Sequence, residues 1–139
     1  FIEMFKVGKD YYLDALNRVV ENEPVFYNKL KNVAYLHLNF FNEHKDIARI
    51  FMQEFLQLGV EMHQAVFQLE EHEIKLLEEL FQQGVREGYF RPVDTRVAAH
   101  AFYGSVNAMS VPMLFFGEKP DLEKLSGEIV DIFLQGIKK

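Results

Sequence analysis

Histidine and glutamate are the residues of this sequence whose side chains could bind a metal ion or transfer a proton. The chain contains no cysteine, so a metal site would depend on imidazole and carboxylate ligands. Helical metal sites use Glu-x-x-His or His-x-x-x-His pairs, because residues three or four positions apart share one helix face. A di-iron site is disfavoured, and a single metal ion held by separate helices stays an open alternative. None of the five histidines has a Glu three positions before it or another His four positions away: His37, His44, His63, His72 and His100.

A glutamate-rich stretch in the middle of the chain could be mistaken for a carboxylate site. Its five glutamates are Glu70, Glu71, Glu73, Glu78 and Glu79. On a helix these positions spread around the axis, and a lysine lies among them. We therefore expect these glutamates to form a solvated helix face.

Motifs for nucleophilic or phosphate chemistry are absent from the sequence. There is no GxSxG elbow, no phosphate-binding loop and no GxGxxG, since the eight glycines lie apart. The lack of cysteine removes thiol nucleophiles and disulfides, which fits a reducing compartment such as the cytoplasm. We predict a protein that is not an enzyme, with no catalytic residue, no resident metal and no cofactor.

Composition limits the partners of the chain. Its 139 residues are the size of one domain, and 49% of them are hydrophobic, including 14 Phe. This aromatic surplus would serve a large interface or an apolar cavity. A net charge of −6 with scattered Lys and Arg disfavours binding to nucleic acid by this chain alone. No apolar run is long enough to span a membrane.

Hydrophobic periodicity predicts about six helices and no sheet. The longest runs from Val60 to Glu87, and at about 1.5 Å per residue it would span roughly 40 Å. Gly88 ends it, and Asp94 offers a side-chain oxygen that can cap the next helix, which runs to about Phe116. The other helices are expected at residues 1–21, at 25–42, at 47–58 and from a cap at Asp121 to the end.

Two histidines fall on apolar helix faces. His37 shares a stripe with Phe40, and His63 shares one with Phe67. A buried His or Tyr beside aromatic side chains would orient a mostly apolar ligand, which is the usual make-up of a small-molecule pocket. The simpler alternative is a core histidine bonded to a backbone carbonyl and a Phe stripe that only fills the core. The stripes therefore predict inward faces and leave core and pocket as alternatives.

The segment from Asp94 to Phe116 carries two apolar strips. The bulky strip, which we expect to fill the domain's own core, comprises Ala99, Phe102, Val106, Met109, Met113 and Phe116. The second strip consists of small residues: Ala98, Ala101, Ser105 and Ala108. Small side chains at heptad-like spacing let another helix approach closely. We expect this segment to have a second partner, and Pro112 to kink or shorten it.

Residues 79–109, ELFQQGVREGYFRPVDTRVAAHAFYGSVNAM, resemble the C-terminal domain of TetR-type transcriptional regulators. In that family an Asp such as Asp94 and an Ala-rich helix follow the end of a long helix. The family's long helix ends in a run that resembles these residues of this sequence: Gln83, Gly84, Glu87, Gly88, Phe90 and Arg91. Residues 43–55, EHKDIARIFMQEF, resemble the short helix that precedes the long one in the family.

The resemblance implies an all-α orthogonal helical bundle whose last two helices pair with those of a second subunit in a four-helix bundle. The dimer contact would use Ala98, Ala101, Ser105, Ala108, Leu125, Ile129, Ile132 and Phe133. The resemblance also implies a pocket between the first helix, which connects to a DNA-binding domain, and the long helix. The residues expected to bind ligand are His37, Phe40, Phe41, Phe51, Phe55, Met62, His63, Phe67, Phe102, Tyr103 and Val106.

An N-terminal helix-turn-helix domain of about 50 residues is implied as well, and this sequence does not contain it. We interpret residues 1–139 as one effector-binding and dimerisation domain of a bacterial, cytoplasmic repressor. Its expected partners are a second copy, a small mostly apolar effector, and DNA only through the missing domain. No membrane partner is expected. The alternative is a ligand-independent helical dimerisation module. A cavity lined by Phe and His would favour the effector domain, and a solid core would favour the alternative.

Overall fold

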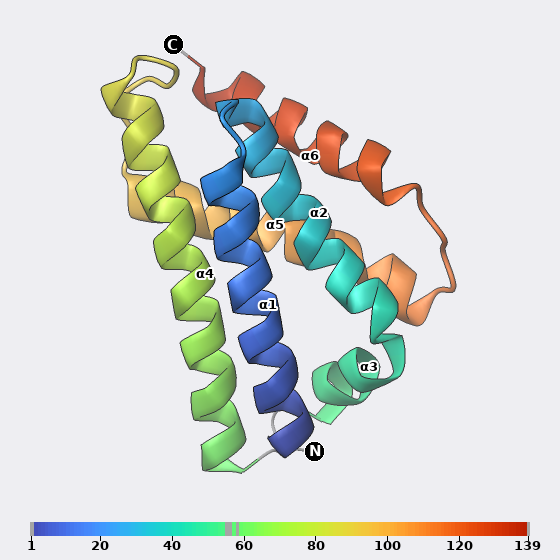
Figure 1. The fold of residues 1–139 in the computed structure, drawn as a ribbon. Helices are drawn as coiled ribbons and strands as arrows, with labels where there is room; N and C mark the ends of the chain where they lie inside the picture. The colour runs from blue at the N-terminus through green and yellow to red at the C-terminus, as the bar shows by residue number, and fades with distance from the viewer. Residues whose placement is uncertain (1, 55–56, 58, 139) are drawn as a thin grey trace.

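The computed structural model contains six α-helices joined by short connections (Figure 1). It describes residues 2–54, 57 and 59–138, with side chains from residue 7 onward except at positions 51 and 54. The helices are α1 (Ile2–Asn22), α2 (Phe26–Glu43), α3 (Lys45–Glu54), α4 (Val60–Arg86), α5 (Thr95–Phe115) and α6 (Leu122–Ile137). The described residues form no strand, and the predicted all-α fold with about six helices is confirmed.

Four of the helices surround a common interior. The longest, α4, has 27 residues and spans about 40 Å. In Figure 1, α1 lies between α4 and α2, while α5 crosses behind α1 and α2. Because α1 and α5 each contact both α2 and α4, the four helices enclose one space. α3 closes the lower end of this space in the view, and α6 covers α2 on its outer side.

The upper half of the interior is a solid apolar core. Leu77 and Phe81 of α4 are completely buried, and so is Leu16 of α1. The Phe81 ring lies 6.0 Å from the ring of Phe102 and 5.4 Å from that of Phe133, measured between centroids. Burial of each such side chain contributes about 1.5 to 3 kcal/mol. This aromatic group joins α4, α5 and α6.

The joint after α4 has the conformation that the sequence predicts. Gly88 has a φ of 81°, which is strained for any residue with a Cβ. The backbone N–H of Tyr89 donates to the carbonyl of Gly84 over 2.9 Å, and that of Gly88 donates to Val85 over 3.2 Å. This pair of hydrogen bonds is a Schellman motif, and it satisfies two carbonyls at the helix end. The chain then turns sharply toward α5.

Both predicted aspartate caps are confirmed. The side chains of Asp94 and Asp121 each accept two hydrogen bonds from backbone N–H groups in the first turn of the following helix, over 3.1 to 3.3 Å. These bonds satisfy donors that the start of a helix leaves unpaired. Pro112 lies inside α5 without ending it, because the helix continues to Phe115.

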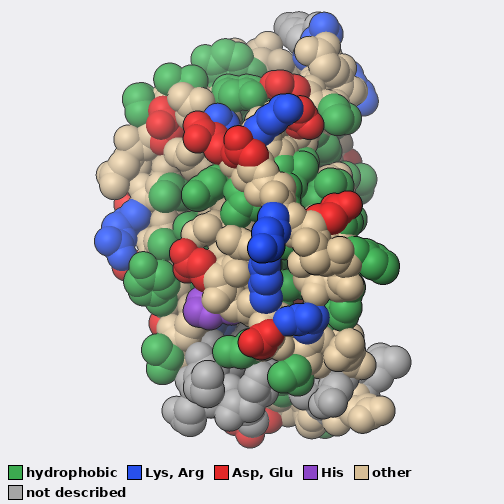
Figure 2. Space-filling model, turned by 90° about the vertical axis from the view of Figure 1, so that its right-hand side faces the viewer, with side chains coloured by type: hydrophobic (Ala, Val, Ile, Leu, Met, Phe, Trp, Pro, Cys, Tyr) green, Lys and Arg blue, Asp and Glu red, His purple; other side chains and the backbone are tan. Residues whose placement is uncertain are grey.

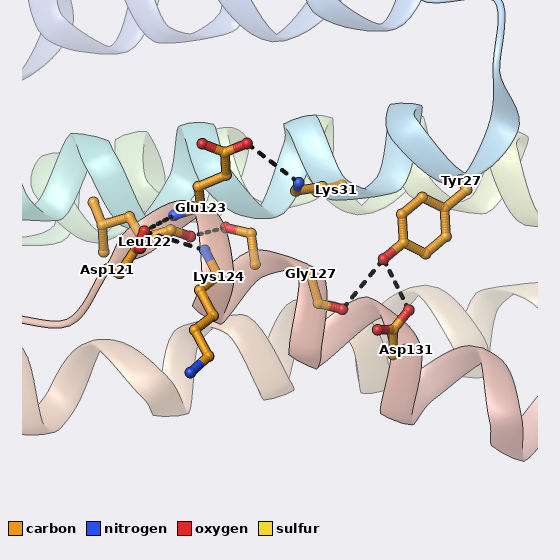
Figure 3. A network of polar contacts seen from close by, with 9 residues as sticks. Tyr27, Lys31, Asp121, Leu122, Glu123, Lys124, Gly127 and Asp131 are labelled. Carbon is orange, nitrogen blue, oxygen red and sulfur yellow. Dashed lines mark hydrogen bonds and ion pairs between the residues drawn. The ribbon is translucent and has the colours of Figure 1, made fainter.

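Polar contacts on the surface accompany the packing of α6 on α2 (Figure 3). The hydroxyl of Tyr27 donates to Asp131 over 2.8 Å, and the Lys31 ammonium lies 3.6 Å from Glu123. Exposed ion pairs contribute at most about 1 kcal/mol each. The apolar contacts of α6, among them the completely buried Val130, therefore hold the two helices together.

The inner face of α4 differs from the prediction in the first half of the helix. Phe67 was expected to point inward, yet it is 66% exposed. The interior is instead reached by Met62, Val66 and Glu73, in line with Leu77. The hydrophobic pattern was misleading because an acidic residue occupies the inner face, which made the neighbouring stripe look more apolar.

The described helices and one face of the molecule bear on what membranes and nucleic acids require. None of the helices described combines the length and the apolar character that a membrane crossing requires. On the face drawn in Figure 2, Lys and Arg side chains are dispersed among acidic and apolar ones. The whole chain has a net charge of −6, and this face offers no concentrated positive field for phosphates.

Candidate ligand-binding site

A cavity of about 250 Å³ lies where α1, α2, α3, α4 and α5 meet. Its wall is mostly apolar and includes Phe40 and Phe41 of α2, Ile47 and Met52 of α3, and Leu69 of α4. An apolar cavity of about 150 Å³ holds a benzene molecule, so this one has room for roughly ten non-hydrogen atoms. A hydrocarbon group that enters it gains about 25 cal/mol for each Å² removed from water.

A buried polar network forms one wall of the cavity. Glu73 is 3% exposed, accepts a hydrogen bond from the Tyr12 hydroxyl, and lies 2.9 Å from Nδ1 of His37. On the other side of the ring, Nε2 of His37 lies 3.0 Å from the side-chain oxygen of Asn107. The four residues come from α4, α1, α2 and α5, respectively. The network therefore links every helix that surrounds the interior.

His37 and Glu73 form an ion pair. Both ring nitrogens of His37 face oxygen acceptors, and only the imidazolium form can donate from both. Burial alone lowers the pKa of His37, but the charge of Glu73 and the hydrogen bonds with Glu73 and Asn107 outweigh it and raise that pKa. Burial, and then the charge of Glu73, raises the pKa of Tyr12, so its hydroxyl stays a donor.

A second acid, Glu70, lines the cavity one turn before Glu73. It is half-buried and hydrogen-bonded to the side chain of Tyr103. Burial, and then the charge of Glu73, raises the pKa of Glu70, whereas the Tyr103 hydroxyl and the charge of His37 oppose the rise. Neither Lys nor Arg is among the described residues of the wall. Glu70 therefore brings a negative charge that no Lys or Arg of this wall neutralises.

The arrangement suits the binding of a small molecule. The described residues hold no group of three or more His, Asp or Glu side chains that could bind a metal ion. Glu73 is paired with His37 and the Tyr12 hydroxyl, and Glu70 is hydrogen-bonded to the side chain of Tyr103. Such a wall can orient the polar group of a ligand, while the remaining surface takes up its apolar part.

Four of the residues expected to bind ligand line the cavity. His37, Phe40, Phe41 and Tyr103 surround it, and the His37 ring packs edge-on against Phe41 and Tyr103 with centroids 5.0 and 5.3 Å apart. The side chains of two further candidates lie outside the described residues: Phe51 and Phe55.

The other candidates lie away from the cavity. Phe102 and Val106 belong to the solid core, and Met62 is buried without lining the cavity. His63 and Phe67 line a shallow groove on the outer face of α4. A role in ligand binding stays a prediction for all of these residues, and the geometry favours the four that line the cavity.

The sequence-based expectation of a solvated glutamate face is wrong for Glu73. This carboxylate is buried because Tyr12 and His37, which lie 61 and 36 positions away in the sequence, reach it with donor groups. One signal was available. Glu73 precedes Leu77 and Phe81 at helical spacing, and an acid on a strongly apolar stripe indicates a buried partner. Tyr12 lies four positions before Leu16 on an apolar stripe, which indicated an inward position but not its partner.

The residues expected at the dimer contact fall into two groups. Exposed in this single chain are Ala101, Ser105, Ala108 and, at 77% exposure, Ile132. Buried or partly buried within the chain are Ala98, Leu125, Ile129 and Phe133. The helical spacing of Ile132 with Leu125 and Ile129 also predicts that it lies on the inner face of α6, and its exposure contradicts that prediction.

Two residues of the bulky strip on α5 also differ from the expectation. Met109 is 39% exposed and Phe116 is 75% exposed, whereas both were expected in the core. Together with the exposed small residues, they give α5 an outward apolar surface. The dimer contact itself stays a prediction.

Comparison with known proteins supports the same architecture. The Fatty acid metabolism regulator protein of Bacillus subtilis (strain 168) is 19% identical over 137 residues, which cover 98% of this chain and 71% of that protein. The fatty acid degradation regulator FadR from Bacillus halodurans superimposes with a TM-score of 0.83 at 22% identity, over 99% of this chain and 74% of that one. The transcriptional regulator FadR from Bacillus subtilis, whose crystal structure contains stearoyl-CoA, has a TM-score of 0.83 at 19% identity, over 98% and 74% of the two chains.

At these identities the solved structures establish a shared fold, and the match to a whole family carries more weight. Residues 26–137 match the family described as Tetracyclin repressor-like, C-terminal domain. The matched region extends from the start of α2 to the end of α6 and includes the joint after α4 and most of the cavity wall. This chain therefore belongs to the tetracyclin repressor-like C-terminal domain family and is the regulatory domain of a TetR-type transcriptional regulator.

Proposed function

We propose that this domain binds a small, mostly apolar effector in the cavity where α1, α2, α3, α4 and α5 meet. The effector would control DNA binding by a helix-turn-helix domain preceding α1. The observation that carries the proposal is the cavity of about 250 Å³ with its apolar wall. A ligand with a hydrocarbon chain fits this wall, in keeping with the stearoyl-CoA in the structure of the Bacillus subtilis relative. The relative's ligand is a guide to the apolar part of the effector only.

We propose that the buried network couples effector binding to the position of α1. Tyr12 of α1 is bonded to Glu73, and both side chains line the cavity. A ligand that binds better when α1 has shifted would favour the shifted state in proportion to its difference in affinity. We propose that such a shift changes the separation of two DNA-binding domains in a dimer, and so lowers affinity for an operator with two half-sites.

Dimerisation would use the outward surface of α5 and α6. Ala101 lies exposed on this surface, and the small residues that follow it on α5 allow close helix packing. Ala101→Glu should place an unpaired charge in the contact and yield a monomer, because burying such a charge costs several kcal/mol. Sedimentation velocity would measure the change, and an unaltered dimer would exclude this surface.

Native mass spectrometry of the purified chain tests the function first, because one spectrum reports subunit number and any retained small molecule. We expect a dimer that carries added mass. Ala48→Trp, which fills the cavity from α3, should remove that mass and leave the dimer. The exposed position Gln82 on α4 provides the control Gln82→Trp, which should retain it. Retained mass in Ala48→Trp would contradict binding in this cavity.

The alternative of a ligand-independent dimerisation module predicts a solid core. The cavity wall formed by His37, Phe40 and Phe41 instead favours the effector domain. A protein that never carries or binds an apolar ligand, yet forms the same dimer, would restore that alternative.

A further inference from the structure

Glu70 lies where the cavity meets the protein surface. Together with Val66 it lines both the cavity and the shallow groove on the outer face of α4. The groove is lined by apolar side chains and by the polar Gln64 and Gln68, whereas the described α3 side chains at the cavity are all apolar. An amphiphilic ligand would leave its apolar chain inside and its polar end at this boundary, because that arrangement keeps the polar group solvated. The polar end would then lie beside Glu70.

The charges around this boundary disfavour an anion. Glu73 is neutralised by His37, whose second nitrogen is occupied by Asn107. Glu70 remains, and no Lys or Arg is among the described residues of the cavity or the groove. A free carboxylate in this position would meet the like charge of Glu70 and gain no cationic partner from the described residues of the wall.

The other polar groups of the wall do not supply that partner. The hydroxyls of Tyr12 and Tyr103 are engaged with carboxylates, Tyr12 with Glu73 and Tyr103 with Glu70. His44 is exposed at the end of α2, with its ring against Phe40. An anion beside His44 would remain in water rather than enter the cavity.

We propose that the effector of this cavity carries an N–H donor at its polar end, of the amine or amide class, and that Glu70 selects this donor and rejects a free carboxylate. This inference rests on the proposed function, because it requires that the cavity binds an apolar chain. Glu70 accepts the hydrogen bond, and a protonated amine adds a charge interaction. Glu70 is thus the specificity-determining residue of the site.

Three probes with the same chain and different polar ends test the proposal: octylamine, octan-1-ol and octanoate. Each has about as many non-hydrogen atoms as the cavity can hold, estimated above as roughly ten. Isothermal titration calorimetry of the purified chain near pH 7.5 would measure each Kd. We expect octylamine to bind about tenfold more tightly than octanoate, a difference of about 1.4 kcal/mol, with octan-1-ol between them.

Two glutamine variants on the same helix separate the local effect of Glu70 from a general effect of charge. Glu70→Gln should bring octanoate and octylamine to within about threefold of each other. Glu71→Gln removes the same charge from the adjacent residue, which does not line the cavity and lies 3.6 Å from Arg96. It should retain the tenfold preference.

The outcomes distinguish this inference from the proposed function. Binding of all three probes with equal affinity to the wild type would overturn the role of Glu70 and leave the apolar cavity supported. A preference for octylamine that persists in Glu70→Gln would assign the selection to another group and overturn the inference. If none of the probes binds, both the inference and the proposed function fail. Since the wild-type ranking is itself decisive, the test does not depend on the folding of a variant.

Discussion

Removing the carboxylate of Glu73 should destabilise the domain more than any other single loss of charge on α4. Glu73→Ala deletes the acceptor of the Tyr12 hydroxyl and the partner of His37 in a site that is 3% exposed. Hydrogen bonds to a charged group contribute about 1.5 to 3 kcal/mol each. Part of this loss returns when His37 releases its proton, so we expect a net cost of about 3 to 5 kcal/mol, typical of a broken buried pair.

Such a cost is a large share of the 5 to 15 kcal/mol that stabilises an average domain. For a chain of this size, about 3 °C per kcal/mol corresponds to a fall in Tm of roughly 10 °C. Thermal unfolding followed by circular dichroism at pH 6 to 7 would measure it. The control Glu79→Ala changes an exposed acid of the same helix and should alter stability by less than about 0.5 kcal/mol. Equal Tm values for the two variants would refute the buried network.

Three further predictions follow from individual contacts. The pKa of His37 is raised, so its contribution to stability is complete below about pH 6.5 and is lost as pH rises through the folded-state pKa. The Tm advantage of wild type over His37→Gln should therefore shrink between about pH 6 and 9. An advantage that grows over this range would contradict the ion pair. Gly84→Ala would place a Cβ 2.4 Å from the Phe90 ring, so urea unfolding should report a loss of about 1 to 3 kcal/mol, and unchanged stability would show that the ring moves freely. Asp94→Ala should lower the free energy of unfolding by about 1 kcal/mol, because it removes the cap of α5. Asp94→Asn should keep a stability near that of wild type in the same assay, and equal losses in the two variants would argue against capping.

The order and ends of the helices could be predicted because their signals are local. Gly88 ends α4, and Asp94 caps α5 through atoms two and three residues away, so each acts almost independently of the rest of the fold. The same holds for Asp121 and α6. The family resemblance also rested on this joint, and the match over residues 26–137 confirms it.

The faces of the helices were harder to predict. In the first half of α4, the apolar stripe through Phe67 competed with one interrupted by Glu73, and periodicity alone favoured the wrong face there. On α6, Ile132 has the same apolar character as Ile129, yet 77% of the first and 8% of the second is exposed. Hydropathy describes what a side chain tolerates, while exposure depends on which helix lies opposite.

The sequence by itself determined an all-helical regulatory domain and singled out His37 as an inward-facing polar residue. It did not distinguish His37 from His63, because both follow aromatic stripes of similar spacing. Only the tertiary structure decided that His37 lies at the cavity, paired with Glu73 and held by Asn107. A buried charge is stable only beside a partner, and here the partners of Glu73 lie on helices 36 and 61 residues away in the sequence. Local patterns do not encode such pairings, because they form only when the helices pack.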